Sequence, residues 1–277
     1  MDVYDSIPDL RAAIARMPRP LGLVPTMGFL HEGHLALVRG ARADNAAAVV
    51  SIFVNPAQFG PAEDYAQYPR DMERDLALLR HAGVDAVFAP PVEVMYPPGF
   101  GTTVAVEGIT GRLEGEFRPG HFRGVTTVVA KLFTIVTPNR AYFGQKDAQQ
   151  LRVIRQMAGD LNLPVEVCAE PTVREEDGLA MSSRNVLLSP TERQAATVLW
   201  RALSEARQRY RAGERSGDRL REAMRAVLTA EPLAKPDYVS VADAATLLEM
   251  AELDRPALLS LAVRIGHTRL IDNVTLP

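Results

Sequence analysis

The sequence predicts an α/β fold, with a doubly wound parallel sheet followed by a smaller α+β domain at the C-terminus. Over residues 1–172, short apolar segments rich in β-branched residues alternate with segments of helical periodicity. The apolar runs are continuous, as expected of strands that are covered on both faces. After residue 172 the composition changes, and long amphipathic helices precede three short strands.

The first part of the chain contains clear helix signals. Ser6 can cap a helix over residues 6–17, and Pro8 stands in its first turn. Another helix is expected to begin near Asp71 and to end at His81-Ala-Gly83. The remaining predicted helices are residues 35–42, 125–136 and 148–157. The predicted strands are residues 21–24, 47–54, 84–88, 102–106, 140–143 and 164–169.

A polar segment at residues 173–178 separates two expected domains, 1–172 and 173–277. Ser189-Pro-Thr-Glu192 forms a capping box with proline at the first helical position, and it predicts a long helix that ends at Gly213. The other elements expected here are a helix at 220–228 and strands at 238–241, 258–265 and 269–271.

Composition limits the classes of partner and compartment. With 277 residues, the chain can form one large domain or two modest ones. A net charge of −3 without runs of like charge argues against nucleic acid or an acidic membrane as partner. No apolar run reaches membrane-spanning length, and residues 1–5 do not resemble an export signal. The single cysteine, Cys168, cannot form an internal disulfide, so we expect a cytoplasmic protein.

The stretch Pro25-Thr-Met-Gly-Phe-Leu-His-Glu-Gly-His34 joins the strand expected at 21–24 to the next helix. Gly28 and Gly33 allow the backbone to bend and to approach a ligand closely. A helix N-terminus presents unpaired N–H groups and a positive dipole end, which suit a phosphate. We therefore expect this turn to bind a nucleotide, with His31 and His34 stabilising charge on a transferring phosphoryl group.

Zinc binding is an alternative role for the same two histidines. The zinc-peptidase pattern needs histidines four residues apart on a continuous helix, whereas His31 and His34 are three apart with a glycine between them. No further His/Cys cluster in the sequence supplies ligands, so zinc is the weaker interpretation. Two surface histidines in a loop are the other alternative.

Further polar motifs follow predicted strands. Gln58 can donate and accept hydrogen bonds, which suits a substrate with hydroxyl and carboxylate groups, although it could be a turn amide beside a buried Phe59. Lys146 could reach phosphates and Asp147 could bind ribose hydroxyls, although such a pair also occurs as a solvated helix cap.

Two basic segments lie elsewhere in the chain. Met181-Ser-Ser-Arg184 offers two hydroxyls and a guanidinium as an anion clamp, or it is an ordinary polar loop. Arg118-Pro-Gly-His-Phe-Arg123 could receive a carboxylate or could simply be exposed. The sequence has no G-x-x-x-x-G-K-[ST] loop, no G-x-G-x-x-G after a strand and no G-x-S-x-G elbow. A nucleotide would therefore depend on the turn at His31 and His34.

Taken together and in this order, these stretches resemble the pantothenate synthetases (pantoate–β-alanine ligases). The matching segments are Pro25-Thr-Met-Gly-x-Leu-His-x-Gly-His34, Ser51-Ile-Phe-Val-Asn-Pro-x-Gln-Phe59, Tyr68-Pro-Arg70, Arg118-Pro-x-His-Phe122, Phe143-Gly-x-Lys-Asp147 with Gln150, and Arg174-Glu-x-Asp-Gly-Leu-Ala-Met-Ser-Ser-Arg-Asn185. The likeness spans nearly the whole chain. Gln145 stands where the family usually has Glu, and Ala57 stands where it usually has Met, which could loosen the wall of the substrate pocket.

The resemblance implies an ATP-dependent ligation in two steps. The carboxylate of (R)-pantoate attacks the α-phosphorus of ATP, which gives a pantoyl adenylate and pyrophosphate. The amine of β-alanine then attacks the activated carbonyl and releases AMP and pantothenate, a precursor of coenzyme A. The resemblance also implies a Rossmann-like fold of the nucleotidyltransferase type, a Mg²⁺ requirement and a homodimer. Because both nucleophiles come from substrates, an activated protein nucleophile is not needed.

The resemblance also assigns residues to ATP. His31 and His34 would contact the phosphates, with His34 as the proton donor, and Lys146 and Arg184 would be the other catalytic residues. The complete set expected at ATP is Met27, Gly28, Phe29, Leu30, His31, Glu32, Gly33, His34, Gly144, Gln145, Lys146, Asp147, Val173, Met181, Ser182, Ser183 and Arg184.

The two other substrates and the metal have their own expected contacts. Gln58 and Gln150 would hold pantoate through its hydroxyl and carboxylate groups, with Met27 and Phe59 packed on its methyl groups. Asp75 is expected to contact Mg²⁺. Either Arg118 or His121 is expected to contact β-alanine.

A reactive adenylate must be kept from water, so the second domain or the glycine-rich segment 108–124 is expected to act as a lid. Two other functions remain open on the sequence alone. A related nucleotidyltransferase would not use a β-amino acid or release AMP. A nucleotide-binding module without catalysis would tolerate the loss of His31, His34, Lys146 and the Ser-Ser-Arg segment, and their presence argues against it.

Overall fold

The structure is a computed structural model of the chain, and it describes residues 1–60, 65–66 and 68–277. The chain forms two compact units. The first comprises Met1–Thr110, Arg118–Gln145 and Gln150–Pro171, and the second comprises Gly111–Phe117, Lys146–Gln149 and Thr172–Pro277. The second unit therefore includes two short segments that lie within residues 1–172.

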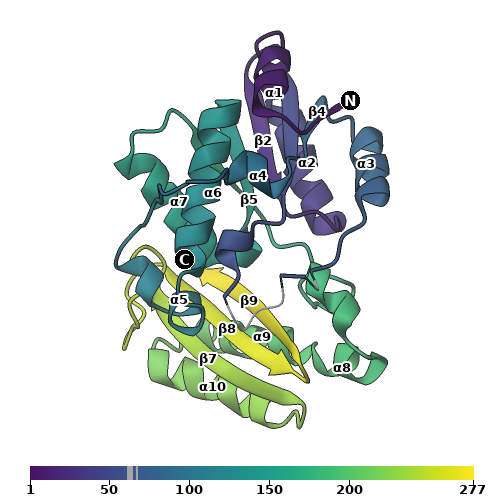
Figure 1. The fold of residues 1–277 in the computed structure, drawn as a ribbon. Helices are drawn as coiled ribbons and strands as arrows, with labels where there is room; N and C mark the ends of the chain where they lie inside the picture. Colours follow the sequence, from purple (N-terminus) through teal and green to yellow (C-terminus); the bar gives the residue numbers. More distant parts are fainter. Residues whose placement is uncertain (61–64, 67) are drawn as a thin grey trace. The chain divides into compact units, whose positions relative to one another are not determined.

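A six-stranded parallel sheet organises the first unit (Figure 1). Its strands are β1 (Asp2–Tyr4), β2 (Leu21–Thr26), β3 (Ala47–Ile52), β4 (Ala86–Phe88), β5 (Arg140–Gly144) and β6 (Glu166–Glu170). They are ordered β1-β4-β3-β2-β5-β6, and every pair is parallel. The chain winds outward from β2 to β4 and then returns to β5 on the other side of β2. This confirms the predicted doubly wound sheet, in which ligands bind where the strand order reverses, beyond the carboxyl ends of β2 and β5.

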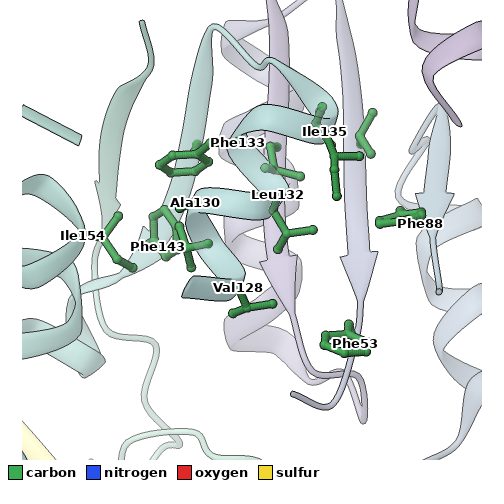
Figure 2. Packing of buried hydrophobic residues seen from close by; sticks show 14 of the residues in the cluster. Phe53, Phe88, Val128, Ala130, Leu132, Phe133, Ile135, Phe143 and Ile154 are labelled. Carbon is green, nitrogen blue, oxygen red and sulfur yellow. The ribbon is translucent and has the colours of Figure 1, made fainter. Parts of the chain in front are cut away.

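Helices cover both faces of this sheet, which explains why its strands are continuously apolar. The helices α1 (Ile7–Ile14), α6 (His121–Val136) and α7 (Ala148–Asp160) contribute to a core on one face. Figure 2 shows this core, where Leu132 and Phe133 of α6 lie among sheet residues such as Phe143. On the other face, α2 (Glu32–Asp44) and α3 (Met72–His81) bury Val38 and Leu79 against the sheet.

Several local predictions need correction. Residues 102–106 form no strand, because side chains of α6 satisfy their backbone: Val104 N–H donates to Thr127 Oγ1 at 3.0 Å, and Thr126 Oγ1 donates to the Val104 carbonyl at 2.6 Å. Helix α2 begins at Glu32 rather than at residue 35, so His34 lies in its first turn. The sequence did not predict β1, whose three residues pair with β4.

The second unit is built on a three-stranded antiparallel sheet in the order β7-β8-β9. The strands are β7 (Ala234–Asp243), β8 (Ala257–Ile265) and β9 (Thr268–Leu276), and α9 (Val198–Arg211) and α10 (Gly217–Thr229) pack against them. The predicted capping box at Ser189 and Glu192 is present, but it begins a short helix, α8 (Pro190–Ala195). The predicted single long helix is therefore wrong: it is interrupted after Ala195, and α9 follows.

Short elements complete the fold. They are α4 (Val92–Met95), α5 (Glu114–Phe117) and the 3₁₀ helices η1 (Pro56–Gln58), η2 (Ile109–Gly111), η3 (Gln145–Asp147) and η4 (Ser183–Leu187). Within the described part of the chain, no helix combines the length and apolar character needed to cross a bilayer.

Candidate active site

The turn after β2 bends through two residues in the left-handed region, Gly28 at φ 79° and Phe29 at φ 51°. Gly28 N–H donates to Thr26 Oγ1 at 3.2 Å, and Thr26 Oγ1 donates to the Ser51 carbonyl at 2.7 Å. A glycine suits this bend for a second reason, since a Cβ on Gly28 would lie 3.0 Å from an oxygen of Asp75. The turn therefore brings the chain sharply from the carboxyl end of β2 to the start of α2.

His31 and His34 cap the N-terminus of α2. His31 is the N-cap residue, and its Nδ1 accepts a hydrogen bond from Gly33 N–H at 3.1 Å. His34 Nδ1 accepts in turn from the backbone N–H of His31 at 3.3 Å. The two ring centroids lie 4.1 Å apart. Because a backbone N–H can only donate, both Nδ1 atoms must be unprotonated in this arrangement, and the ring protons lie on Nε2. The turn thus holds two neighbouring Nε2–H donors at a helix N-terminus.

Asp75, on α3, holds this turn through hydrogen bonds to its backbone. Its Oδ2 accepts from Phe29 N–H at 2.6 Å, and its Oδ1 accepts from Leu30 N–H at 2.7 Å. The residue is only 1% exposed. Burial raises the pKa of the Asp75 carboxyl above its ordinary value, and the N–H groups of Leu30 and Phe29 oppose this by stabilising the ionised form. The Arg74 guanidinium lies 3.9 Å from Asp75 Oδ1 and 5.5 Å from the centre of the Phe29 ring.

The expected contact of Asp75 with Mg²⁺ competes with this backbone role, because each carboxylate oxygen already accepts a short hydrogen bond. Among the residues that the structure describes, no group of three or more His, Cys, Asp and Glu side chains could hold a metal ion. The described residues thus contain no cluster from which a protein-only metal cage could be built.

Gln58 lies in the first unit, after β3, and is 8% exposed. Its Nε2 lies 3.1 Å from Met27 Sδ, so the structure brings together these two residues expected at pantoate. His121 Nδ1 lies 2.9 Å from the Gln58 carbonyl, and His121 Nε2 lies 3.1 Å from a guanidinium nitrogen of Arg118. A carbonyl can only accept and a guanidinium can only donate, so His121 carries its proton on Nδ1. Arg118 and His121 thus support the backbone of Gln58.

The two remaining residues expected at pantoate lie on different elements. Phe59 packs edge-on against Tyr65 and Tyr68, with ring centroids 5.5 and 6.0 Å away. Gln150 is half-buried on α7.

Strand β5 ends at Gly144, and the 3₁₀ helix that contains Gln145, Lys146 and Asp147 follows it directly. Since β5 is the parallel neighbour of β2, the end of β5 at Gly144 and the histidine turn after β2 both lie at the reversal of strand order. Lys146 belongs to the second unit, where its Nζ lies 3.8 Å from an oxygen of Asp147. The carbonyl of Lys146 accepts a hydrogen bond from Asn273 Nδ2 at 2.8 Å.

The Met181–Arg184 segment is folded by local hydrogen bonds. Ser182 caps η4, with its hydroxyl accepting from Arg184 N–H at 3.2 Å, and Ser183 is buried. Met181 N–H donates to the Val173 carbonyl at 3.0 Å, which joins two of the residues expected at ATP. The segment is therefore a structured loop in the second unit.

Arg174 lies at the start of the segment that leads into this loop. The guanidinium makes a bidentate pair with the buried Asp272 at 2.6 and 2.9 Å and lies 3.8 Å from the centre of the Trp200 ring. It also donates to the Gly178 carbonyl at 3.1 Å. Asp272 and Asn273 are neighbours on β9, so one dipeptide holds both Arg174, upstream of the Met181–Arg184 segment, and the backbone of Lys146.

A family model described as Pantoate-beta-alanine ligase matches residues 2–275 of this chain. The chain belongs to the pantoate–β-alanine ligase family. A curated pantothenate synthetase from Roseiflexus castenholzii is 65% identical over 276 residues, which cover 100% of this chain and 99% of the relative. The family match favours a C–N bond-forming ligase over the two other functions that the sequence left open.

Solved structures of this ligase family share the fold. A crystal structure of pantothenate synthetase from Thermus thermophilus superposes with a TM-score of 0.95 at 53% identity, and the match covers 99% of each chain. A pantoate–β-alanine ligase from Francisella tularensis, whose structure is described as complexed with "Beta-gamma ATP" and β-alanine, has a TM-score of 0.81 at 33% identity and matches 99% of this chain and 97% of its own.

The motifs of this ligase are visible in the sequence, whereas the side chains that support them are not. The sequence predicts a metal contact for Asp75, not its bonds to the histidine turn, and it does not predict the pairing of Asp272 and Asn273 with distant segments. A signal is present for the dipeptide, because these two adjacent polar residues stand between the apolar residues Ile271 and Val274. Asp75 gave a similar signal as a carboxylate on the buried side of α3.

Replacing Asp75 by Asn should lower the free energy of unfolding by about 1–3 kcal/mol, because the amide can accept from only one of the two buried N–H groups. The KM for ATP should rise with it, since the histidine turn loses its support. Urea unfolding at pH 7 and initial-rate kinetics measure the two effects. Asp71→Asn is the matched control, because Asp71 caps the same helix at a half-buried position and Asn caps equally well. Equal stabilities of the two variants would contradict the role of Asp75.

Proposed function

We propose that this protein joins (R)-pantoate to β-alanine by way of a pantoyl adenylate, with ATP as the activating substrate. Family membership and the nucleotide and β-alanine in the Francisella tularensis relative support the substrates. The observation that carries the mechanism is the pair of Nε2–H donors at the head of α2, beside the reversal of strand order. Donors fixed in this way stabilise negative charge without reorganising during the reaction.

In the first step, a carboxylate oxygen of pantoate attacks the α-phosphorus, and the bond to the bridging oxygen of pyrophosphate breaks. Negative charge builds up on the phosphate oxygens as this happens. His31 and His34 donate to these oxygens through Nε2–H, His34 is the proton donor, and the positive end of the α2 dipole adds to the attraction. Met27, Gly28, Phe29, Leu30, Glu32 and Gly33 form the rest of this phosphate-binding turn.

In the second step, the amine of β-alanine attacks the acyl carbon of the adenylate, and AMP leaves with the electron pair of the broken C–O bond. The amine loses a proton as the amide forms. We assign the β-alanine carboxylate to Arg118 rather than to His121, whose Nδ1–H donates to the Gln58 carbonyl and whose Nε2 accepts from Arg118. The enzyme's contribution is to position the two substrates, because neither step uses a protein nucleophile.

The second unit supplies the other phosphate ligands in this proposal. Lys146, Ser182, Ser183 and Arg184 hold the phosphates, and Gly144, Gln145, Asp147, Val173 and Met181 line the nucleoside. Lys146 acts as a point charge, whereas the guanidinium of Arg184 can bind two oxygens at once. Two contacts of β9 support this assignment: Asp272 pairs with Arg174, and Asn273 donates to the carbonyl of Lys146. The second unit or residues 108–124 would exclude water from the adenylate.

Pantoate is bound by Gln58 and Gln150, with Met27 and Phe59 against its methyl groups. Mg²⁺ would enter with ATP and would neutralise phosphate charge; no step is assigned to a protein-bound metal. We further propose a homodimer that acts in the cytoplasm. The oligomeric state can be tested by sedimentation equilibrium, and the single cysteine agrees with a reducing compartment.

The direct test of function is to incubate the protein with ATP, Mg²⁺, (R)-pantoate and β-alanine and to measure AMP and pantothenate. His34→Ala should lower kcat for this reaction by roughly 10²–10³-fold, the effect of losing one transition-state donor. His81→Ala is the control, because His81 is exposed at the end of α3. A fall in kcat of less than about threefold would remove His34 from the mechanism.

Lys146→Ala should slow adenylate formation by roughly 10²-fold and affect the second step much less, because its charge acts on phosphates that leave in the first step. Pyrophosphate release without β-alanine measures the first step. AMP release from preformed adenylate on addition of β-alanine measures the second. Lys235→Ala, at an exposed position on β7, is the control. Equal slowing of both steps would contradict this assignment.

A further inference from the structure

A chain of hydrogen bonds lies behind Gln58 and ends at Tyr96, a residue with no assigned role. The Tyr96 hydroxyl lies 2.7 Å from Asn55 Oδ1. Asn55 Nδ2 lies 3.1 Å from Gln58 Oε1 and 3.1 Å from the carbonyl of Gly124. Asn55 is 1% exposed, so its amide has to find its partners within the protein.

Backbone groups determine the direction of every bond in this chain. Ala57 N–H, which can only donate, lies 3.3 Å from the oxygen side of the Asn55 amide. The Gly124 carbonyl, which can only accept, faces the nitrogen side. The amide orientation of Asn55 therefore follows from its neighbours, and Tyr96 must be the donor to Oδ1. Asn55 Nδ2 then donates to Gln58 Oε1, which leaves the amide nitrogen of Gln58 on the side of Met27.

The two backbone segments that set the orientation of the Asn55 amide, at Ala57 and Gly124, lie close together. A Cβ on Gly124 would overlap the carbonyl of Ala57, so only glycine lets α6 approach η1 this closely. Asn55 bridges this contact by accepting from Ala57 and donating to Gly124. The bridge leaves Asn55 no favourable alternative orientation, because a flipped amide would place like groups against each other.

Tyr96 is fixed by aromatic and cationic neighbours. Its ring centroid lies 5.1 Å from that of Phe100 and 6.2 Å from that of Phe53, and Lys131 Nζ lies 5.9 Å from the centre of its ring. Burial raises the pKa of Tyr96 to about 12, so the hydroxyl keeps its proton at neutral pH. The Tyr96 hydroxyl therefore remains a hydrogen-bond donor at neutral pH.

We infer that Tyr96 is a positioning residue that acts through Asn55 to fix Gln58 with its amide N–H directed at the substrate acid. The inference rests on the proposed binding of pantoate by Gln58. It makes Gln58 a hydrogen-bond donor, so the group that it contacts must be an acceptor, either a carboxylate or a hydroxyl oxygen. An acid without an acceptor at that position would lose this contact.

Tyr96→Phe removes the terminal donor without changing the shape of the ring. It should raise the KM for pantoate by about three- to tenfold, the range for one buried hydrogen bond. The KM values for ATP and β-alanine should stay the same. Tyr142→Phe is the control, because Tyr142 is a buried tyrosine whose hydroxyl bonds with Asn45 and Asp44 on the other face of the sheet. The melting temperature of each variant shows whether stability alone explains a change.

A double-mutant cycle with Gln58→Ala tests whether Tyr96→Phe changes the KM for pantoate through Gln58. Gln58→Ala should raise the KM for pantoate, and adding Tyr96→Phe to it should raise the KM no further. Gln58→Glu tests the donor role separately. A carboxylate can still accept from Asn55, but it presents an oxygen to the substrate, so Gln58→Glu should bind pantoate more weakly than Gln58→Ala.

The outcomes separate the two proposals. If Gln58→Ala leaves the KM for pantoate unchanged, the assignment of pantoate to Gln58 fails, and the inference fails with it. If Gln58→Ala raises this KM but Tyr96→Phe acts no differently from Tyr142→Phe, only the inference is overturned. An effect of Tyr96→Phe that persists in the Gln58→Ala background, or a Gln58→Glu variant that binds pantoate better than Gln58→Ala, would overturn it as well.

Discussion

The carboxylate of Asp75 accepts hydrogen bonds from the backbone N–H groups of Phe29 and Leu30, and the position of the histidine turn depends on these two bonds. Phe29 lies in the left-handed region, which costs a non-glycine residue on the order of 1–2 kcal/mol. Hydrogen bonds to an ionised acceptor contribute roughly 1.5–3 kcal/mol each, and the pair opposes this strain. The bonds hold the bend, and α2 begins with both imidazoles at its N-terminus.

The same principle applies to the other motifs. Buried polar groups elsewhere hold the backbone or the amide of residues that are expected to touch substrates. Asp272 and Asn273 do this for the Arg174 loop and for Lys146 within the second unit. Asn55 does it for Gln58 within the first unit. An enzyme whose substrates supply both nucleophiles depends on such positioning more than on reactive side chains.

Much of the fold could be predicted because strand and helix periods are local properties of the sequence. The errors lie where a distant partner decides: residues 102–106 look like a strand, but hydroxyls of Thr126 and Thr127 satisfy the backbone of Val104. The candidate site shows the same division. The histidine turn can be predicted because its residues are contiguous in the sequence. Asp75 lies far along the chain from Phe29 and Leu30, whose N–H groups donate to it, and no local pattern predicts that pairing.

The most direct test of this account is the protonation of the two imidazoles, measured by ¹⁵N NMR on protein with labelled histidines. Single substitutions can assign the resonances, since the chain has only five histidines. The account predicts that the neutral rings of His31 and His34 both carry their proton on Nε2, and that Mg·ATP shifts the Nε2 resonances of both. A proton on Nδ1 of either ring, or resonances that do not respond to ATP, would contradict it.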